Sequence, residues 1–154
     1  MLTIRDATQA DAASIALLMS ELGYPTAESD MRERLAAIEA DGNHRTLVAQ
    51  VAGAVVGVAG VGLARYYERT GTYGRLLVLA VREGHRRTGL GRALVKSAEA
   101  WAASRGARAM LVNTAHHRES AHLFYAGIGY ASTGLRFVKE LEPDAAMAVP
   151  NGRR

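Results

Sequence analysis

The chain has 154 residues, of which 49% are apolar and 22% are charged, a composition typical of one ordinary globular domain. It contains no cysteine, which excludes a disulfide framework, a thiolate metal site and a cysteine nucleophile. No apolar run is long enough to cross a bilayer, and the first residues lack the pattern of a secretion signal. We therefore expect a cytoplasmic protein that does not bind a membrane.

Hydrophobic periodicity predicts alternating strands and helices along the first half of the chain. Thr8 and Asp11 have the spacing of a helix start, and Gly23-Tyr24-Pro25 ends that helix. The predicted elements are a strand at 2–7, helices at 8–22 and 26–41, and strands at 46–51, 55–63 and 76–81. A polar segment rich in tyrosine and glycine, 65–74, connects the last two strands.

The second half of the chain continues this alternation. Its predicted elements are a helix at 91–105, a strand at 110–114, a helix at 118–127, and closing strands near 130–133 and 135–141. The segment 142–154 has two prolines and no periodicity, so we expect a flexible tail after a single domain at 1–141. This order predicts an α+β fold, whose mixed and mostly antiparallel sheet has about seven strands and flanking helices.

The most informative segment is the loop Arg86-Arg87-Thr88-Gly89-Leu90-Gly91-Arg92, between a buried strand and an amphipathic helix. Two glycines at a strand-to-helix turn allow several backbone N–H groups to point inward together. The start of the helix adds partial positive charge, and His85 and the neighbouring arginines add more. These features predict a cradle for a diphosphate.

Two common phosphate-binding loops do not fit this segment. A P-loop needs a lysine followed by serine or threonine, and this pair is absent at the required spacing after Gly84, Gly89 or Gly91. A dinucleotide fingerprint needs a third small residue where Leu94 stands. The spacing Arg-x-x-Gly-x-Gly, formed by Arg86, Gly89 and Gly91, instead resembles the acyl-CoA-binding motif of the GNAT superfamily of N-acetyltransferases.

A second block of residues supports this resemblance. The series Ala121-x-x-Phe124-Tyr125-x-x-x-Gly129-Tyr130 closely resembles the second GNAT signature, and it follows the first at a compatible distance. The resemblance implies that Tyr125 is the general acid that protonates the departing thiolate. The alternative is that this tyrosine only packs its ring against the core.

The resemblance implies the GNAT fold, in which the fourth and fifth strands run parallel and splay apart, and it implies acetyl-CoA as the cofactor. The pantetheine arm of acetyl-CoA would pair with the backbone of the fourth strand. The residues implied to bind the cofactor are Leu79, Ala80, Val81, Arg86, Arg87, Thr88, Gly89, Leu90, Gly91, Arg92, Asn113, Arg118 and Ser120. Arg118 departs from the family pattern, because an asparagine often stands at its position.

The sequence does not single out a general base. The predicted fourth strand has no carboxylate, whereas many members of the family have a glutamate there. The candidates are Glu21, Glu68 and His116, although the simpler interpretation of each is an ordinary surface residue. The alternative is that a chain of water molecules accepts the proton. His116, His117 and His122 lack a carboxylate at ligand spacing, so we predict a solvated helix edge and no metal site.

The acceptor pocket is predicted around the turn between the first two helices and the connection before the fourth strand. The residues nominated for it are Glu21, Tyr24, Tyr66, Tyr67, Glu68 and Tyr73. Tyrosines with carboxylates suit a cationic amine, although an ordinary polar loop explains the same residues. The basic loop suits one compact polyanion, so we expect no nucleic-acid partner.

We therefore expect an acetyl-CoA-dependent N-acetyltransferase that acts on the primary amine of a small molecule by direct transfer in a ternary complex. An acyl-enzyme route lacks its commonest nucleophile, because there is no cysteine. A protein or peptide acceptor and a non-catalytic acyl-CoA-binding module are the alternatives. The predicted strands at 130–141 are candidates for a dimer edge, so a homodimer is one assembly to test.

Overall fold

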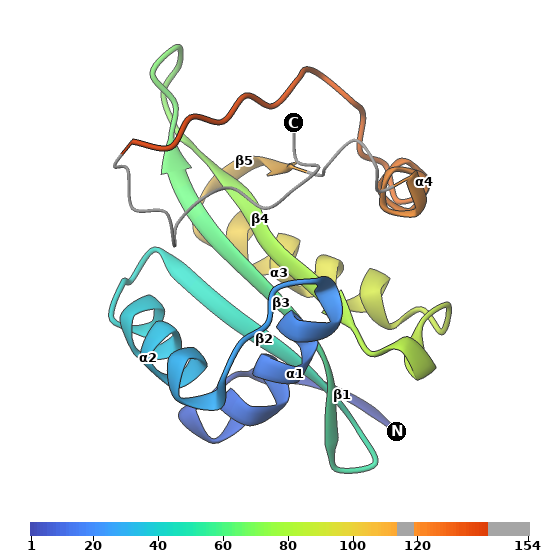
Figure 1. Cartoon of the computed structure of the whole chain (residues 1–154). Helices are drawn as coiled ribbons and strands as arrows, with labels where there is room; N and C mark the ends of the chain where they lie inside the picture. Colours follow the sequence, from blue (N-terminus) through green and yellow to red (C-terminus); the bar gives the residue numbers. More distant parts are fainter. Residues whose placement is uncertain (114–118, 142–154) are drawn as a thin grey trace. The chain divides into compact units, whose positions relative to one another are not determined.

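The computed structural model describes residues 1–113 and 119–141 (Figure 1). The chain forms two compact units, residues 1–112 and residues 113–154. The segment 142–154, which was expected to be a flexible tail, lies outside the described residues. None of the described helices has both the length and the apolar character that spanning a bilayer requires.

The first unit is a five-stranded sheet with helices on both faces. In chain order its elements are β1 (Leu2–Asp6), the 3-10 helix η1 (Gln9–Asp11), α1 (Ala12–Leu22), α2 (Glu28–Glu39), β2 (His44–Val51), β3 (Ala54–Arg65), β4 (Thr72–Val81), the 3-10 helix η2 (Glu83–His85), α3 (Leu90–Ser104) and β5 (Ala107–Val112). The strand order is β1-β2-β3-β4-β5, antiparallel throughout except for the parallel pair β4–β5. This confirms the predicted α+β class and the mixed, mostly antiparallel sheet.

The predicted start of the first helix is present in detail. The Thr8 hydroxyl accepts a hydrogen bond from the N–H of Ala10, and the Asp11 carboxylate accepts one from the N–H of Thr8. This reciprocal capping box starts the 3-10 helix η1, which leads directly into α1, and it satisfies N–H groups that have no partner within the helix. Gly23 then ends α1 at a φ of 111°, a left-handed conformation that favours glycine.

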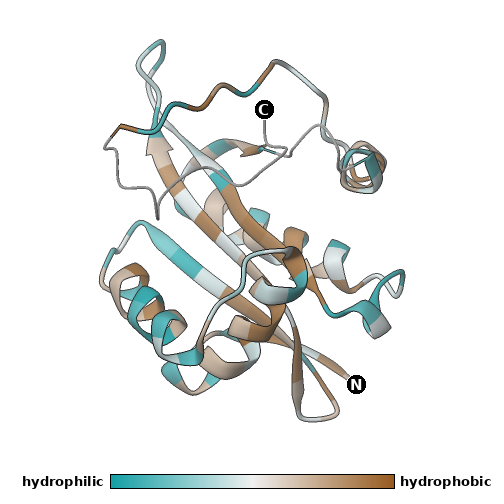
Figure 2. Ribbon diagram, in the orientation of Figure 1, coloured by the Kyte–Doolittle hydropathy of each residue, from teal (hydrophilic) through white to brown (hydrophobic). Residues whose placement is uncertain are grey.

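The helices cover opposite faces of the sheet (Figure 1). Val58 of β3 is buried among residues of α1 and α2, whereas a β-carbon on the preceding residue, Gly57, would meet Leu90 and Leu94 of α3. Successive residues of a strand point to opposite faces, so α3 lies on one face and α1 with α2 on the other. Figure 2 shows the resulting hydrophobic colouring along β3 and β4.

β4 continues well beyond the point where its pairing with β5 stops. The parallel ladder ends at Leu76 and Val112, whereas β4 runs on to Val81. At this point the register with β3 shifts and leaves Leu77 as an extra, bulged residue. From Leu77 to Val81, β4 therefore has a strand partner on its β3 side only, within the described part of the chain.

The second unit contains α4 (Glu119–Gly127), which lies within the predicted helix at 118–127; residue 118 lies outside the described residues. Its Tyr125 ring packs edge-on against two other rings, with centroid distances of 5.1 Å to Phe124 and 5.7 Å to Tyr130. The motif that suggested this helix therefore forms a small aromatic cluster.

The two closing strands predicted at 130–133 and 135–141 are not formed, so the sheet has five strands in the described residues rather than about seven. Residues 131–140 are exposed throughout. A two-stranded hairpin is marginal in water without a third strand or a helix to cover it. The alternating pattern of these residues indicated strands, but the described part of this unit provides no strand partner for them.

Candidate active site

The loop between β4 and α3 is fixed by bonds within itself. The Arg86 guanidinium donates from Nε to the carbonyl oxygen of Val81, 3.0 Å away. The Thr88 hydroxyl donates over 2.6 Å to the carbonyl oxygen three residues earlier. Arg87 and Gly89 adopt left-handed conformations with φ of 64° and 83°. The backbone therefore turns sharply immediately before α3.

The first turn of α3 has no side-chain cap. Gly89 occupies the N-cap position, where it has no side chain to accept a hydrogen bond, and its carbonyl accepts from the N–H of Ala93 at 3.0 Å. Within the described residues, no acceptor bonds the N–H groups of Leu90, Gly91 or Arg92. Free N–H groups and the helix dipole together favour an anion at this position.

Basic side chains surround this helix start. Arg86, Arg87 and Arg92 are exposed, and His85 is half-buried. None of the four forms an ion pair with a carboxylate in the described part of the chain. The local charge around this helix start is therefore positive.

Beyond the end of β5, alternate residues of β4 direct their backbone groups to the edge that faces away from β3. The N–H of Arg82 donates to the carbonyl of Val56 on β3 at 2.9 Å, so by alternation the backbone of Ala80 also faces β3. The methyl group of Ala80 is buried in the core. Leu79 and Val81 therefore direct their N–H and C=O groups away from β3. The third nominated strand residue, Ala80, directs its backbone groups toward β3 instead.

The tyrosines of the β3–β4 connection are partly brought together. The rings of Tyr66 and Tyr73 lie 4.9 Å apart, and the guanidinium of Arg69 lies 4.5 Å from the Tyr66 ring. Tyr67 and Glu68 occupy the exposed tip of the connection. The nominated tyrosines thus include one tilted ring pair and one fully exposed side chain.

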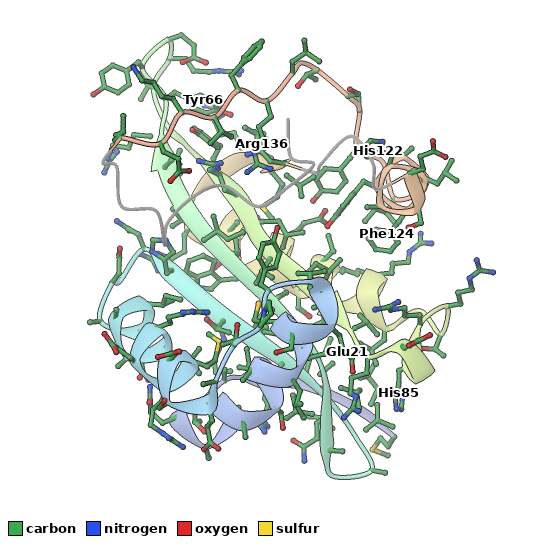
Figure 3. All side chains as sticks on the ribbon, viewed as in Figure 1. Glu21, Tyr66, His85, His122, Phe124 and Arg136 are labelled. Atoms are coloured by element: carbon green, nitrogen blue, oxygen red, sulfur yellow. The ribbon has the colours of Figure 1, made fainter. Side chains whose placement is uncertain are left out.

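Glu21 lies at the other end of β4. Its carboxylate is 3.6 Å from Nε of Arg82, immediately after the strand. Tyr73 and Val81 are eight residues apart, which at a rise of roughly 3.3 Å per residue is about 26 Å. Figure 3 shows Glu21 and Tyr66 at opposite ends of the strand. One small amine cannot contact both, so the six nominated residues do not form a single pocket. Tyr24, 45% exposed, lies in the loop after α1.

The nominated residues of the second unit are described in part. Ser120 is exposed in the first turn of α4, and Asn113 is exposed after β5. Arg118 and the base candidate His116 lie outside the described residues. In the described ranges, no group of three or more potential ligands could hold a metal ion.

Three residues near the β4 bulge were not singled out from the sequence. The register pairs His44 with Gly62 and Gly62 with Arg75, so these residues form one row across the sheet. Leu77, 52% exposed, also lies close to Gly62 on this face. The available signal was the spacing of Gly60 and Gly62, which leaves one face of β3 without side chains at these two positions.

Comparisons with known proteins agree with this geometry. The family model described as Acetyltransferase (GNAT) family matches residues 12–130. A search of the curated proteins finds no significant match. Similar solved structures include a GNAT family acetyltransferase from Staphylococcus aureus subsp. aureus USA300_TCH1516 (24% identity, TM-score 0.78, covering 91% of this chain and 98% of that chain), an aminoglycoside antibiotic 6'-N-acetyltransferase from Acinetobacter haemolyticus (19%, 0.78, 91% and 99%) and a glucosamine-6-phosphate N-acetyltransferase from Arabidopsis thaliana (18%, 0.80, 92% and 99%).

The solved structures are less than 25% identical to this chain and show its fold. The family match covers most of the chain, including the loop 86–92 and the aromatic motif of α4. The chain therefore belongs to the Acetyltransferase (GNAT) family and is an enzyme of the acetyltransferase class.

Proposed function

We propose that this enzyme transfers the acetyl group of acetyl-CoA directly to the primary amine of a small molecule in a ternary complex. Two features that follow one another along the chain carry the proposal. The first is the end of β4, which has no strand partner on its β5 side; the second is a basic, uncapped helix start. Acetyl-CoA contains an arm with amide groups and a diphosphate. The two features fit the two parts of acetyl-CoA: Leu79 and Val81 would bind the arm, and the loop 86–92 would bind the diphosphate.

The proposed reaction needs a polarised carbonyl and two proton movements. Bound acetyl-CoA supplies an activated thioester. The transfer joins the amine nitrogen to the acetyl carbon, breaks the carbon–sulfur bond, removes one proton from the amine and adds one to the thiolate. Tyr125 is the proposed donor of that proton because of its motif position, and solvent would reprotonate the phenol. A free N–H of the β4 edge would polarise the thioester oxygen. Water is the proposed acceptor of the amine proton.

The names of similar structures support a small acceptor. Two of these proteins are named as N-acetyltransferases of an aminoglycoside and of glucosamine 6-phosphate. The lack of cysteine supports direct transfer rather than an acyl-enzyme.

The test is release of the CoA thiol from acetyl-CoA by the full chain, with polyamines, aminoglycosides, amino acids and short peptides as acceptors. We expect release that depends on a small amine and is slower in Tyr125→Phe. Calorimetry measures acetyl-CoA binding in parallel. Lack of acetyl-CoA binding would contradict the whole proposal, whereas turnover with peptides alone would contradict the small acceptor.

A further inference from the structure

We propose that the amine acceptor also carries an anionic group, a carboxylate or a phosphate, and that Arg75 binds this group beside His44. The inference rests on the proposed acetyl transfer and names the class of acceptor for it. It replaces the expectation of a purely cationic amine held by tyrosines and carboxylates.

The row formed by His44, Gly62 and Arg75 has a bare centre. Gly62 has no side chain, so the two flanking side chains border a floor of backbone. A β-carbon placed on Gly62 would lie 2.9 Å from Nε2 of His44 and 3.3 Å from Cδ1 of Leu77. The imidazole therefore leans over Gly62 toward Leu77, where β4 leaves β5. The row thus reaches the strand edge proposed for the acetyl donor.

On the opposite face of the sheet, side chains of β5 and α3 occupy the space next to the row. Gly74 precedes Arg75, and a β-carbon on Gly74 would lie 2.5 Å from Sδ of Met110 and 3.0 Å from Cβ of Ala102 in α3. Alternation places Arg75 on the other face, where its side chain is exposed. The face that carries the row is therefore the side of the sheet that α3 leaves open at this level.

The ring of His44 is oriented by its own turn. Its Nδ1 is buried, lies 3.1 Å from a carboxylate oxygen of Asp41 and forms no hydrogen bond of acceptable geometry with the described residues, while its backbone N–H donates to the carbonyl of Asp41 at 3.1 Å. The second carboxylate oxygen of Asp41 accepts from the N–H of Asn43 at 2.9 Å. With this turn, Nε2 of the ring lies over Gly62. Nε2 is therefore the ring nitrogen nearest to the open centre of the row.

The charges along the row favour an anion. Arg75 forms no ion pair and no hydrogen bond with the described residues. The carboxylate that borders the row, Asp41, is already engaged by His44 and Asn43. Glu21 pairs with Arg82 at the far end of β4. A polycationic amine would meet Arg75 without a compensating carboxylate, whereas a carboxylate or phosphate would form a bidentate, charge-assisted pair.

The position of Arg75 also limits the size of the acceptor. Arg75 and Leu77 are two residues apart, and because Leu77 is bulged they are separated by at most about 7 Å along the strand. An acceptor that pairs with Arg75 and presents its amine at the strand edge must carry the two groups a few bonds apart. Amino acids and amino-sugar phosphates have this arrangement.

The test uses pairs of amines that differ only in the anionic group: alanine with alaninamide, and glucosamine 6-phosphate with glucosamine. Calorimetry on the full chain saturated with CoA measures the Kd of each amine, and thiol release measures kcat/KM. We expect the anionic member of at least one pair to bind about tenfold more tightly. Arg75→Gln should remove this preference without changing the Kd of acetyl-CoA. Arg65→Gln is the matched control, because Arg65 is exposed on the opposite face of β3 and should keep the preference.

The outcomes separate this inference from the proposed function. A preference confined to one pair identifies the anion as carboxylate or phosphate. Preferential binding without thiol release from any amine would support the anion site and contradict the acetyl transfer. Equal binding within both pairs, no binding of any of the four amines, or equal losses for both members in Arg75→Gln would overturn the inference, whatever the thiol assay shows.

Discussion

Arg86 donates a hydrogen bond from Nε to the carbonyl oxygen of Val81, the last residue of β4, at 3.0 Å. By alternation that carbonyl points away from β3, to the strand edge beyond the end of β5. The same side chain therefore closes the loop before α3 and occupies an acceptor at the strand edge. Its terminal guanidinium nitrogens form no other bond to the described residues and are available for a phosphate.

We predict that Arg86→Lys weakens acetyl-CoA binding about fivefold, because one ammonium group cannot hold Val81 and a phosphate in the geometry of a guanidinium. Calorimetry measures the Kd. Arg87→Lys is the control, since the Arg87 side chain forms no bond within the described residues and its charge is retained. Equal affinities of the two variants would show that only charge matters at Arg86.

Gly89→Val should weaken acetyl-CoA binding about tenfold while the protein stays folded. Gly89 has a φ of 83°, a conformation that costs other residues about 1–2 kcal/mol. No atom lies within 4 Å of a β-carbon there, so the strain falls on the loop rather than on the core. Gly84→Val, in the same loop with equal space and no left-handed φ, is the control. Similar affinities for both variants would remove the backbone argument; circular dichroism checks the fold.

Tyr125→Phe should lower kcat about 100-fold with an unchanged Kd for acetyl-CoA, because it removes only the proposed proton donor. Thiol release measures kcat and calorimetry measures the Kd. Tyr130→Phe is a matched control, since its ring packs against Tyr125 in the same aromatic cluster. Full activity of Tyr125→Phe would leave Tyr125 with a packing role alone.

Local signals in the sequence predicted those parts of the fold that depend on near neighbours. The capping box at Thr8 and the glycine stop at Gly23 form as predicted, because each is completed within a few residues. The helix at 91–105 was predicted to within one residue, since its apolar face repeats regularly against the sheet. The glycine turn before it is likewise a short-range signal.

Features that depend on distant partners were not predicted. β4 begins at Thr72, whereas the apolar run suggested residue 76, because pairing with β3 and β5 makes the polar residues 72–75 part of the strand. The closing strands required a partner that the pattern alone could not supply. The row of His44, Gly62 and Arg75 depends on the register of three strands, which no single stretch of sequence encodes.

Gly74→Ala should destabilise the fold by about 1–3 kcal/mol, because its methyl group would overlap Met110 of β5 and approach Ala102 of α3. Urea unfolding measures the free energy of unfolding. Gly42→Ala is the control, since no atom lies within 4 Å of a β-carbon there. The destabilisation by Gly74→Ala should be smaller in a Met110→Ala background. An equal cost in both backgrounds would rule out the contact with Met110 as its cause.

Asp11 should make the stability of the fold depend on pH in the acid range. Hydrogen bonds from the Arg5 guanidinium at 2.9 Å hold the pKa of the Asp11 carboxyl below its usual range, and the N–H of Thr8 adds to this effect. Because the folded-state pKa is the lower one, the contribution is complete above the unfolded pKa of about 3.9 and is lost as the pH falls through the folded pKa.

Asp11→Asn should therefore lower the free energy of unfolding at pH 7 by about 1–2 kcal/mol, and the difference from the unmodified protein should shrink below pH 4. Urea unfolding between pH 7 and pH 2 measures both effects. Asp6→Asn removes a carboxylate that is 60% exposed and paired with Arg45, and such surface pairs contribute little, so it should have a small effect at every pH. A difference for Asp11→Asn that persists unchanged to pH 2 would show that lost packing, rather than lost charge, destabilises this variant.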